Sequence, residues 1–313
     1  MESVVLLSGG TGGAKLARGL LDACDDLTVV ANTGDDIDIY GVHVSPDPDL
    51  VTYWLADEID ERGWGLRGDT WQVMEALERA GRPHWFRLGD RDLAMCLLRT
   101  ERLRAGQTPT QAHQAVVDAM GVEARVLPMS DHPVSTWVGV RGRRVPFQEF
   151  MIVEKAEGPV EGVELRGLHR APPSDAVLQA IAEADAIVIG PSNPVISIGP
   201  ILALPGMREA LRSAPAPVVA VSPFVGGRAV KGPTEPFCEQ AGIPISASGI
   251  ARAYSDVIDG IVADESSNGT PELVTDTLME TPEDRARLAR EVLDFAASVP
   301  DSLGSQPPAR RTP

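Results

Sequence analysis

A run of glycines near the start of the chain has the composition of a phosphate-binding loop. Residues 8–13 read SGGTGG and stand between a short apolar run, residues 4–7, and a stretch in which Leu16 and Leu20 recur at helical spacing. This order predicts a buried strand, a tight loop and a helix. Glycines at such a junction let backbone N–H groups approach an anion closely at the positive end of the helix, which suits a phosphate.

The glycine loop matches neither of two common nucleotide-binding fingerprints. It is not a Walker A loop, because Lys15 follows Ala14 and no Ser or Thr comes next. Gly10 and Gly12 match the start of the dinucleotide fingerprint, but Lys15 occupies the position of its third glycine. A tight turn without a ligand is the alternative, and several glycines at a strand–helix junction favour binding instead.

Two acidic segments follow the second predicted strand. Residues 32–41 (NTGDDIDIYG) are typical of a solvated turn, although an acid here holds ribose hydroxyls in dinucleotide folds. In residues 45–49 (SPDPD), Asp49 precedes an apolar helical pattern, which predicts a helix N-cap, with Asp47 in the turn before it. Alternatively, the carboxylates of Asp47 and Asp49 bind Mg²⁺ or a substrate hydroxyl, since Mg²⁺ prefers oxygen ligands beside phosphates.

Two further segments carry polar groups at the ends of predicted elements. Asp90 and Arg91 stand directly before a helix, where they either cap it and form ion pairs or place Arg91 as a clamp on a phosphate or carboxylate. Ser192 and Asn193 follow a predicted core strand and are flanked by many apolar residues, which favours a ligand loop over a surface turn. Residues 222–233 follow the next strand in the same way, so we expect both loops to line one crevice.

Apolar runs predict the sheet that positions these loops. Two of them form a strand–helix–strand opening, which favours a parallel sheet and an α/β fold. In an open parallel sheet, the loops at the carboxyl ends of the strands line the ligand crevice. The predicted buried strands are residues 4–7, 27–32, 185–190, 216–222 and 259–264.

The middle of the chain has a different pattern. Residues 68–81 predict a helix with Asp69 as N-cap and Gln72 completing a capping box, and residues 108–121 predict a second helix with Thr108 and Gln111 in those roles. Residues 135–153 predict a hairpin that turns near Gly142. We therefore predict a nucleotide-binding core of residues 1–45 and 171–299, a mixed α+β inserted segment of residues 46–170, and a disordered tail of residues 300–313.

Composition narrows the classes of function. The 313 residues carry a net charge of −17, which disfavours nucleic-acid binding, and no stretch is long enough to span a membrane. The three cysteines have no CxxC spacing, which argues against a zinc site or disulfide framework and for a reducing, cytoplasmic location. No HExxH or GxSxG motif occurs. Phosphate-type loops and acids without a nucleophile indicate transfer chemistry carried out by positioning and a metal.

Nine sequence blocks, taken in order, resemble the 2-phospho-L-lactate transferase family over residues 5–264. The blocks are SGGTGGAKL, ANTGDD, SPDPD, GLRGDTW, FRLGDRD, LPMSDHPVST, FQEFMIV, GPSNPVISIGPIL and VAVSPFVGG. The resemblance implies a Rossmann-like, Mg²⁺-dependent and dimeric enzyme of coenzyme F420 biosynthesis. Such an enzyme transfers phospholactate or phosphoenolpyruvate from its guanosine diphosphate derivative to the ribityl hydroxyl of the deazaflavin Fo, and GMP leaves.

The resemblance also implies roles for particular residues. Asp49 would bind Fo or a Mg²⁺ shared with Asp47 and would orient or deprotonate the attacking hydroxyl. Asp90, the second expected catalytic residue, would hold Fo or the transferred phosphate together with Arg91. Ser192 and Asn193 would contact the guanosine part. The residues expected to face the nucleotide phosphates are Gly9, Gly10, Thr11, Gly12, Gly13 and Lys15.

The sequence leaves two other functions to be considered. A sister family of UDP-sugar-binding regulators resembles the chain at the glycine loop, but its members are expected to carry a GPGS-type loop where residues 190–194 read GPSNP. A nucleotide-dependent dehydrogenase is disfavoured by the broken dinucleotide fingerprint. The sequence therefore favours the transferase.

Overall fold

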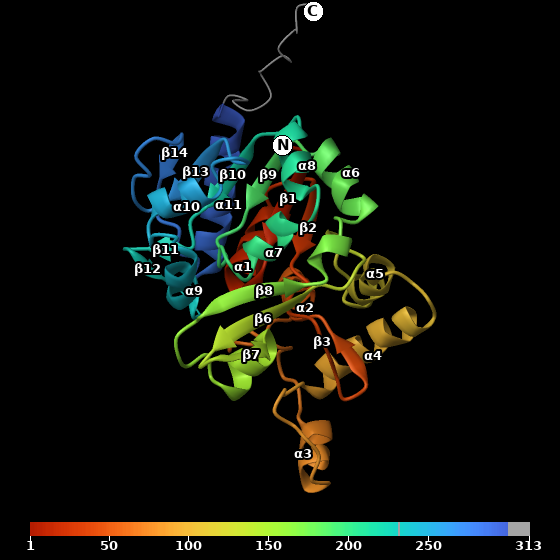
Figure 1. Cartoon of the computed structure of the whole chain (residues 1–313). Helices are drawn as coiled ribbons and strands as arrows, with labels where there is room; N and C mark the ends of the chain where they lie inside the picture. Colours follow the sequence, from red (N-terminus) through yellow and green to blue (C-terminus); the bar gives the residue numbers. More distant parts are fainter. Residues whose placement is uncertain (231, 300–313) are drawn as a thin grey trace, which may run out of the picture.

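Seven parallel strands form the central sheet, in the spatial order β14-β13-β10-β9-β1-β2-β5 (Figure 1). The computed structural model describes residues 1–230 and 232–299. Every neighbouring pair in this sheet is parallel, which confirms the predicted α/β class. The strands are β1 (Ser3–Ser8), β2 (Asp26–Ala31), β5 (Arg125–Pro128), β9 (Ala186–Ile189), β10 (Val218–Val221), β13 (Gly260–Ala263) and β14 (Glu272–Val274).

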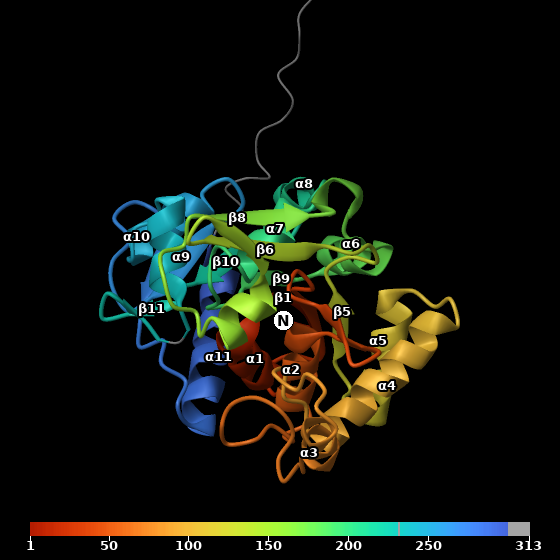
Figure 2. The same cartoon turned by 60° about the horizontal axis from the view of Figure 1, so that its bottom comes forward.

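Helices cover both faces of the sheet, which explains why its central strands are almost entirely apolar. Along β1, Val4 and Leu6 pack into one core and Val5 and Leu7 into the other. Figure 2 shows the two helical layers on opposite sides of the strands. One layer holds α1 (Gly10–Leu21), α2 (Pro46–Leu55), α5 (Pro109–Ala119) and α11 (Pro282–Ser298); the other holds α6 (Asp175–Glu183), α7 (Ile198–Ala203), α8 (Met207–Ser213) and α10 (Ala247–Ala253).

The segment predicted as an insertion also contributes to the core. All five predicted strands are present, but β5 lies inside residues 46–170 and pairs with the edge of β2, Val29 opposite Val126. Residues 46–170 are therefore not wholly separate from the nucleotide-binding core. The short run RVLP of β5 carries no alternation by which it could be distinguished from a loop. The predicted tail, residues 300–313, lies outside the described residues.

Smaller units, from the inserted segment and from the flanking parts of the chain, lie beside the carboxyl ends of the sheet strands. Strands β3 (Ile37–Ile39) and β4 (Val42–Val44) form one antiparallel pair. The predicted hairpin is confirmed as β6 (Ser135–Val140) and β7 (Arg143–Pro146), with β8 (Gly162–Arg166) on the other side of β6. The remaining short elements are the π-helical turn Glu149–Val153, the 3₁₀ turn Leu168–Arg170, β11 (Phe224–Val225), β12 (Arg228–Ala229) and α9 (Thr234–Ala241).

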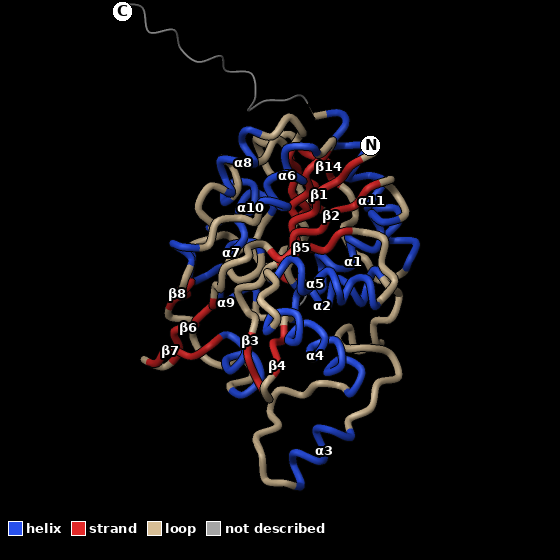
Figure 3. The backbone as a smooth tube through the Cα atoms, turned by 90° about the vertical axis from the view of Figure 1, so that its right-hand side faces the viewer, coloured by secondary structure: helices blue, strands red, loops and turns tan. Residues whose placement is uncertain are grey.

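Helix α3 (Gln72–Arg79) lies at the end of an arm that extends away from the main body, below α4 (Asp90–Arg104) in the view of Figure 3. The predicted cap of this helix is wrong. Asp90 accepts hydrogen bonds from the backbone N–H of Gln72 and Val73, both 3.0 Å, while Asp69 accepts from Arg91 N–H at 2.8 Å. The starts of the two helices face one another. Asp90, the first residue of α4, therefore caps α3, and Asp69, which lies shortly before α3, caps α4.

The second predicted cap is confirmed. Thr108 accepts a hydrogen bond from Gln111 N–H, and the Gln111 side chain accepts from Thr108 N–H, so α5 begins with a full capping box and with Pro109 in its first turn. Gly121 follows the helix with a φ of 67°. Among residues 1–230 and 232–299, no helix is long and apolar enough to cross a membrane.

Candidate active site

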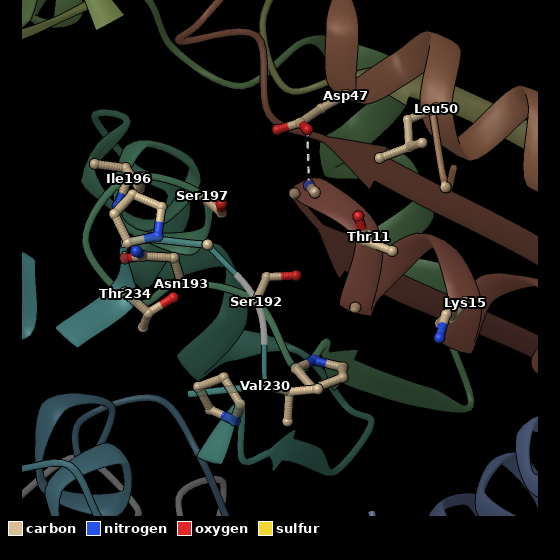
Figure 4. A pocket seen from close by; sticks show the side chains of 18 of the residues that line it. Thr11, Lys15, Asp47, Leu50, Ser192, Asn193, Ile196, Ser197, Val230 and Thr234 are labelled. Atoms are coloured by element: carbon tan, nitrogen blue, oxygen red, sulfur yellow. Dashed lines mark hydrogen bonds between the residues drawn. The ribbon is translucent and has the colours of Figure 1, made fainter. Parts of the chain in front are cut away.

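A pocket of about 450 Å³ opens where the loops after β1, β9 and β10 come together. In the sheet, β2 lies on one side of β1, whereas β9 and β10 lie on its other side. The direction in which successive strands are added therefore reverses at β1. In open parallel sheets, the crevice at such a reversal is where ligands bind. Figure 4 shows Thr11 and Asp47 across this pocket from Asn193 and Thr234.

The glycine loop forms one wall of the pocket, as the sequence predicts. Helix α1 begins at Gly10, whose N–H donates to Asp47 Oδ1 at 2.7 Å, and Gly13 N–H donates to Ser192 Oγ at 3.2 Å. A Cβ at position 12 would lie 2.0 Å from the carbonyl oxygen of Pro191. These glycines therefore serve two purposes: they let the loop pack against the β9 loop, and they leave the helix start accessible.

The loop after β9 supplies polar groups to the opposite wall. The side-chain oxygen of Asn193, Oδ1, accepts hydrogen bonds from the N–H groups of Val195 and Ile196, at 2.8 and 3.2 Å. Its Nδ2 is buried and has no hydrogen-bond partner among the described residues. Since a buried donor is costly when unpaired, Nδ2 is positioned to donate to a ligand in the pocket. Ser192 and Asn193 are thus brought together with the glycine loop.

Lys15 also lines the pocket, one helical turn beyond the glycine loop. Its ammonium group donates to the carbonyl oxygen of Met279 at 2.7 Å. This contact draws the segment after β14 against α1 and places a positive charge near the site. Lys15 therefore acts as a point charge on a wall whose other titratable groups are mainly acidic.

Two carboxylates meet at the acidic side of the pocket, and one buried amide joins them. Asn32 is fully buried, and its Nδ2 donates to Asp47 Oδ2 at 3.0 Å and to Asp35 Oδ1. Its carbonyl oxygen accepts from Gly34 N–H at 2.8 Å, which fixes the orientation of the amide. Asp35 and Asp47 both line the pocket. The structure thus holds two carboxyl groups close together through one amide nitrogen.

Burial makes the charged forms of these acids unfavourable. Burial raises the pKa of Asp47 to about 6, against the hydrogen bonds from Asn32 and Gly10. Burial also raises the pKa of Asp35 well above its usual range, and the neighbouring Asp47 carboxylate raises it further. A divalent cation would stabilise both charges, and carboxylate oxygens are the ligands that Mg²⁺ prefers. The residues present therefore fit a Mg²⁺ site.

Asp49 lies elsewhere, although the sequence pairs it with Asp47. Its two carboxylate oxygens accept from Arg99 Nη1 and Nη2, at 2.6 and 2.7 Å, and it is 4% exposed and outside the pocket lining. Side chains two positions apart on a helix point in different directions, which separates Asp49 from Asp47. The N-cap interpretation is also wrong, because α2 begins three residues earlier, at Pro46, after Ser45.

Asp90 and Arg91 are the first two residues of α4 and also lie outside the pocket lining. Asp90 is occupied by its capping contacts with α3. The Arg91 guanidinium donates to the carbonyl oxygen of Arg67 at 2.9 Å and to Glu58 at 3.2 Å. These contacts are those expected of the capping and ion-pair interpretation, and they do not bring either residue to the glycine loop.

The sequence interpretation missed several residues that line the pocket, among them Asp35, Arg62 and Trp64. Asp35 belongs to the acidic run that was assigned to a solvated turn, and its distance in sequence from Asp47 hides their proximity. Arg62 and Trp64 come from the loop after α2, where no motif marks them. The GDD sequence at residues 34–36 directly after a core strand was the available signal for Asp35.

The fold and the site together define an α/β protein of the doubly wound type with a pocket at the reversal of strand order. The family model described as 2-phospho-L-lactate transferase CofD matches residues 4–292, and the chain belongs to this family. This membership supports a CofD-type role in coenzyme F420 biosynthesis and confirms the predicted resemblance.

Named relatives cover nearly the whole chain. A phosphoenolpyruvate transferase of Kitasatospora aureofaciens is 41% identical, over 95% of this chain and 98% of the relative. A 2-phospho-L-lactate transferase of Methanosarcina acetivorans is 37% identical, over 96% and 100%. Among solved structures, a UPF0052-family protein of Bacillus halodurans superimposes with a TM-score of 0.62 at 19% identity, covering 94% and 99%, which shows a shared fold.

Proposed function

We propose that the protein transfers a phospho-acid, 2-phospholactate or phosphoenolpyruvate, from its guanosine diphosphate derivative to the deazaflavin Fo and releases GMP. The observation that carries this proposal is the pocket at the reversal of strand order, which combines a glycine loop with the neighbouring carboxyl groups of Asp35 and Asp47. The names of the relatives support both candidate acids.

The glycine loop and the β9 loop are suited to bind the diphosphate donor. Backbone N–H groups at the start of α1 and the Lys15 ammonium favour phosphate oxygens, and the Asn193 Nδ2 donor is available to a ligand. Holding the donor and the acceptor hydroxyl in one pocket makes the displacement effectively unimolecular. No residue need form a covalent intermediate, since the hydroxyl of the acceptor is itself the nucleophile.

Asp35 and Asp47 are the residues that would hold Mg²⁺. When bound, this ion would supply positive charge that neutralises the diphosphate oxygens. Asn32 keeps the two carboxylates at the pocket wall, so they are in place before substrate arrives. We assign this role to Asp47 with Asp35, and the proposed catalytic role of Asp49 would require it to leave its ion pair with Arg99.

A turnover assay that detects both products tests the proposed function directly. Purified protein with Fo, Mg²⁺ and the guanylylated donor is expected to release GMP and to produce a phospho-acid ester of Fo that mass spectrometry identifies. Competing donors that carry lactate or enolpyruvate would show which acid the pocket prefers. Absence of GMP together with tight UDP-sugar binding would contradict the proposal. Light scattering of the same sample tests the proposed homodimer.

A further inference from the structure

An exposed indole stands in the wall of the same pocket. Trp64 is 46% exposed, and it lines the pocket together with Arg62. The other aromatic residue in the described lining, Phe147, is only 9% exposed and packs against Phe237 at a centroid distance of 6.4 Å. Trp64 is therefore the aromatic surface that a ligand in the pocket can reach.

The loop that carries Trp64 is held in a defined shape. Arg67 N–H donates to Glu58 O at 2.8 Å, and Asp60 N–H donates to Gly65 O at 3.0 Å, so the loop is a short hairpin. Leu66 anchors it, since this side chain is 1% exposed. The indole is thus displayed from an ordered loop, which lowers the entropy lost when a ligand contacts it.

Arginine side chains pack against the indole of Trp64 and against that of its neighbour Trp71. The Arg62 guanidinium carbon lies 4.4 Å from the Trp64 ring centroid and 5.1 Å from that of Trp71, and its Nε donates to Asp60 Oδ1. Arg87 lies 5.0 Å from the Trp71 ring centroid. The result is a cluster of guanidinium and indole groups beside the pocket, in which the Trp64 and Trp71 ring centroids lie 6.0 Å apart.

We propose that Trp64, supported by Arg62, is the stacking platform for a planar heteroaromatic ring of a substrate. This inference rests on the proposed function, in which both substrates carry such a ring: the deazaflavin of Fo and the guanine of the donor. Stacking on an aromatic side chain tolerates different rings because every such ring presents a π-face. The glycine loop holds the phosphates, so the ring occupies another part of the pocket wall.

Binding measurements without turnover test the platform. Calorimetry compares the wild-type protein, Trp64→Ala and Trp64→Phe for Fo and for GMP separately. We expect Trp64→Ala to weaken one of these ligands by about tenfold or more, and Trp64→Phe to retain most of the affinity. The ligand that is weakened identifies the stacked ring. Inorganic pyrophosphate, which lacks a ring, is expected to bind equally to all three proteins.

A matched control lies on the same arm. Val73 is 40% exposed and outside the pocket lining, so Val73→Ala is expected to leave both affinities unchanged. Affinities for Fo and for GMP that are both unaltered in Trp64→Ala would overturn the platform, and so would a wild-type protein that binds neither ring. Loss of a dimer in Trp64→Ala without a change in affinity would assign the indole to a subunit interface instead. Turnover is measured in parallel, so a wild-type protein that binds the ring through Trp64 but transfers nothing would contradict only the proposed function.

Discussion

Asp47 lies at the point where the helix start, the acidic pair and the pocket meet. Gly10 N–H and Asn32 Nδ2 each donate to one of its carboxylate oxygens, at 2.7 and 3.0 Å, yet burial still raises its pKa to about 6. These two hydrogen bonds therefore do not fully replace the water that the carboxylate loses. A cation bound at this position would offset the remaining cost of burying the carboxylate charge. Because the cation requires the ionised carboxylate, its binding is expected to depend on pH.

The first prediction concerns this pH dependence. Metal binding requires the carboxylate form, so Mn²⁺ affinity, measured by electron paramagnetic resonance, is expected to fall as the pH drops through about 6. In the metal-free protein, the free energy of unfolding is expected to change with pH in the opposite direction. Because the folded pKa lies above the unfolded value, the contribution of Asp47 to the free energy of unfolding is present below pH about 4 and is lost as the pH rises to about 6.

Asp47→Asn is the control for both measurements. This variant keeps the shape of the side chain and removes its titration, so its stability relative to wild type is expected to increase between pH 4 and 7. Its Mn²⁺ affinity is expected to be at least about 100-fold weaker, which exceeds the effect of most outer-shell changes. Equal Mn²⁺ affinity in the two proteins would remove Asp47 from the metal site.

The second prediction separates a structural from a catalytic role of Asp49. Asp49→Ala leaves the Arg99 charge buried without its partner, and breaking such a pair costs about 3–5 kcal/mol. Urea unfolding measures this loss. The double variant Asp49→Leu with Arg99→Met is expected to recover much of the stability, because no buried charge remains. A folded, equally stable Asp49→Ala protein without turnover would instead support the proposed catalytic role.

Two aspartates cap the starts of α3 and α4, and each accepts hydrogen bonds from the helix that it does not belong to or directly precede. Asp69 receives N–H donors from Arg91 and Asp92, and Asp90 receives donors from Gln72 and Val73. A Cβ at Gly89 would lie 2.1 Å from the Asp69 carboxylate, so this glycine lets the two starts approach. The arm is thus tied at its base by four backbone hydrogen bonds to two carboxylates.

The third prediction follows from this arrangement. Asp90→Ala is expected to lower the free energy of unfolding by about 1 kcal/mol and to speed hydrogen exchange in α3, with at most a small change in turnover. Asp69→Ala is the matched control, and its faster exchange is expected at the start of α4. If Asp90→Ala abolishes turnover while α3 stays protected from exchange, the proposed catalytic role of Asp90 stands.

Elements whose signals are local could be predicted, and those that depend on distant partners could not. The buried strands, the glycine loop and the Thr108 capping box each lie within a few neighbouring residues. The exchange between Asp69 and Asp90 involves residues 21 positions apart, and sequence spacing assigns each acid to its nearest helix. The pairing of Asp35 with Asp47 was missed for the same reason, because Asn32 connects them only in the folded chain.

At the scale of the whole molecule, the sequence carries a net charge of −17, and Asp35 and Asp47 line the pocket. Self-repulsion of such an excess destabilises the compact state, and salt screens it over a Debye length of about 8 Å at physiological ionic strength. A general effect of ions and a specific effect of Mg²⁺ are therefore both expected, and they can be separated.

The fourth prediction distinguishes these two effects. Raising NaCl from low salt to about 0.15 M is expected to increase the Tm by a few degrees. Mg²⁺ at the same ionic strength is expected to add a further increase, since a ligand at 100 times its Kd stabilises by about 2.7 kcal/mol. In Asp47→Asn the NaCl effect is expected to persist and the additional Mg²⁺ effect to disappear. An equal response of both proteins to Mg²⁺ would show that its effect is only screening.

The place of β5 has a consequence for any attempt to simplify the molecule. This strand pairs along β2 from Thr28 to Ala31. Excising residues 46–170 to obtain a minimal nucleotide-binding unit would remove that pairing and leave an unprotected row of N–H and C=O groups along β2. Such an open edge recruits other chains, so the shortened protein would be prone to aggregate. A workable truncation would have to retain β5 and shorten only the protruding arm.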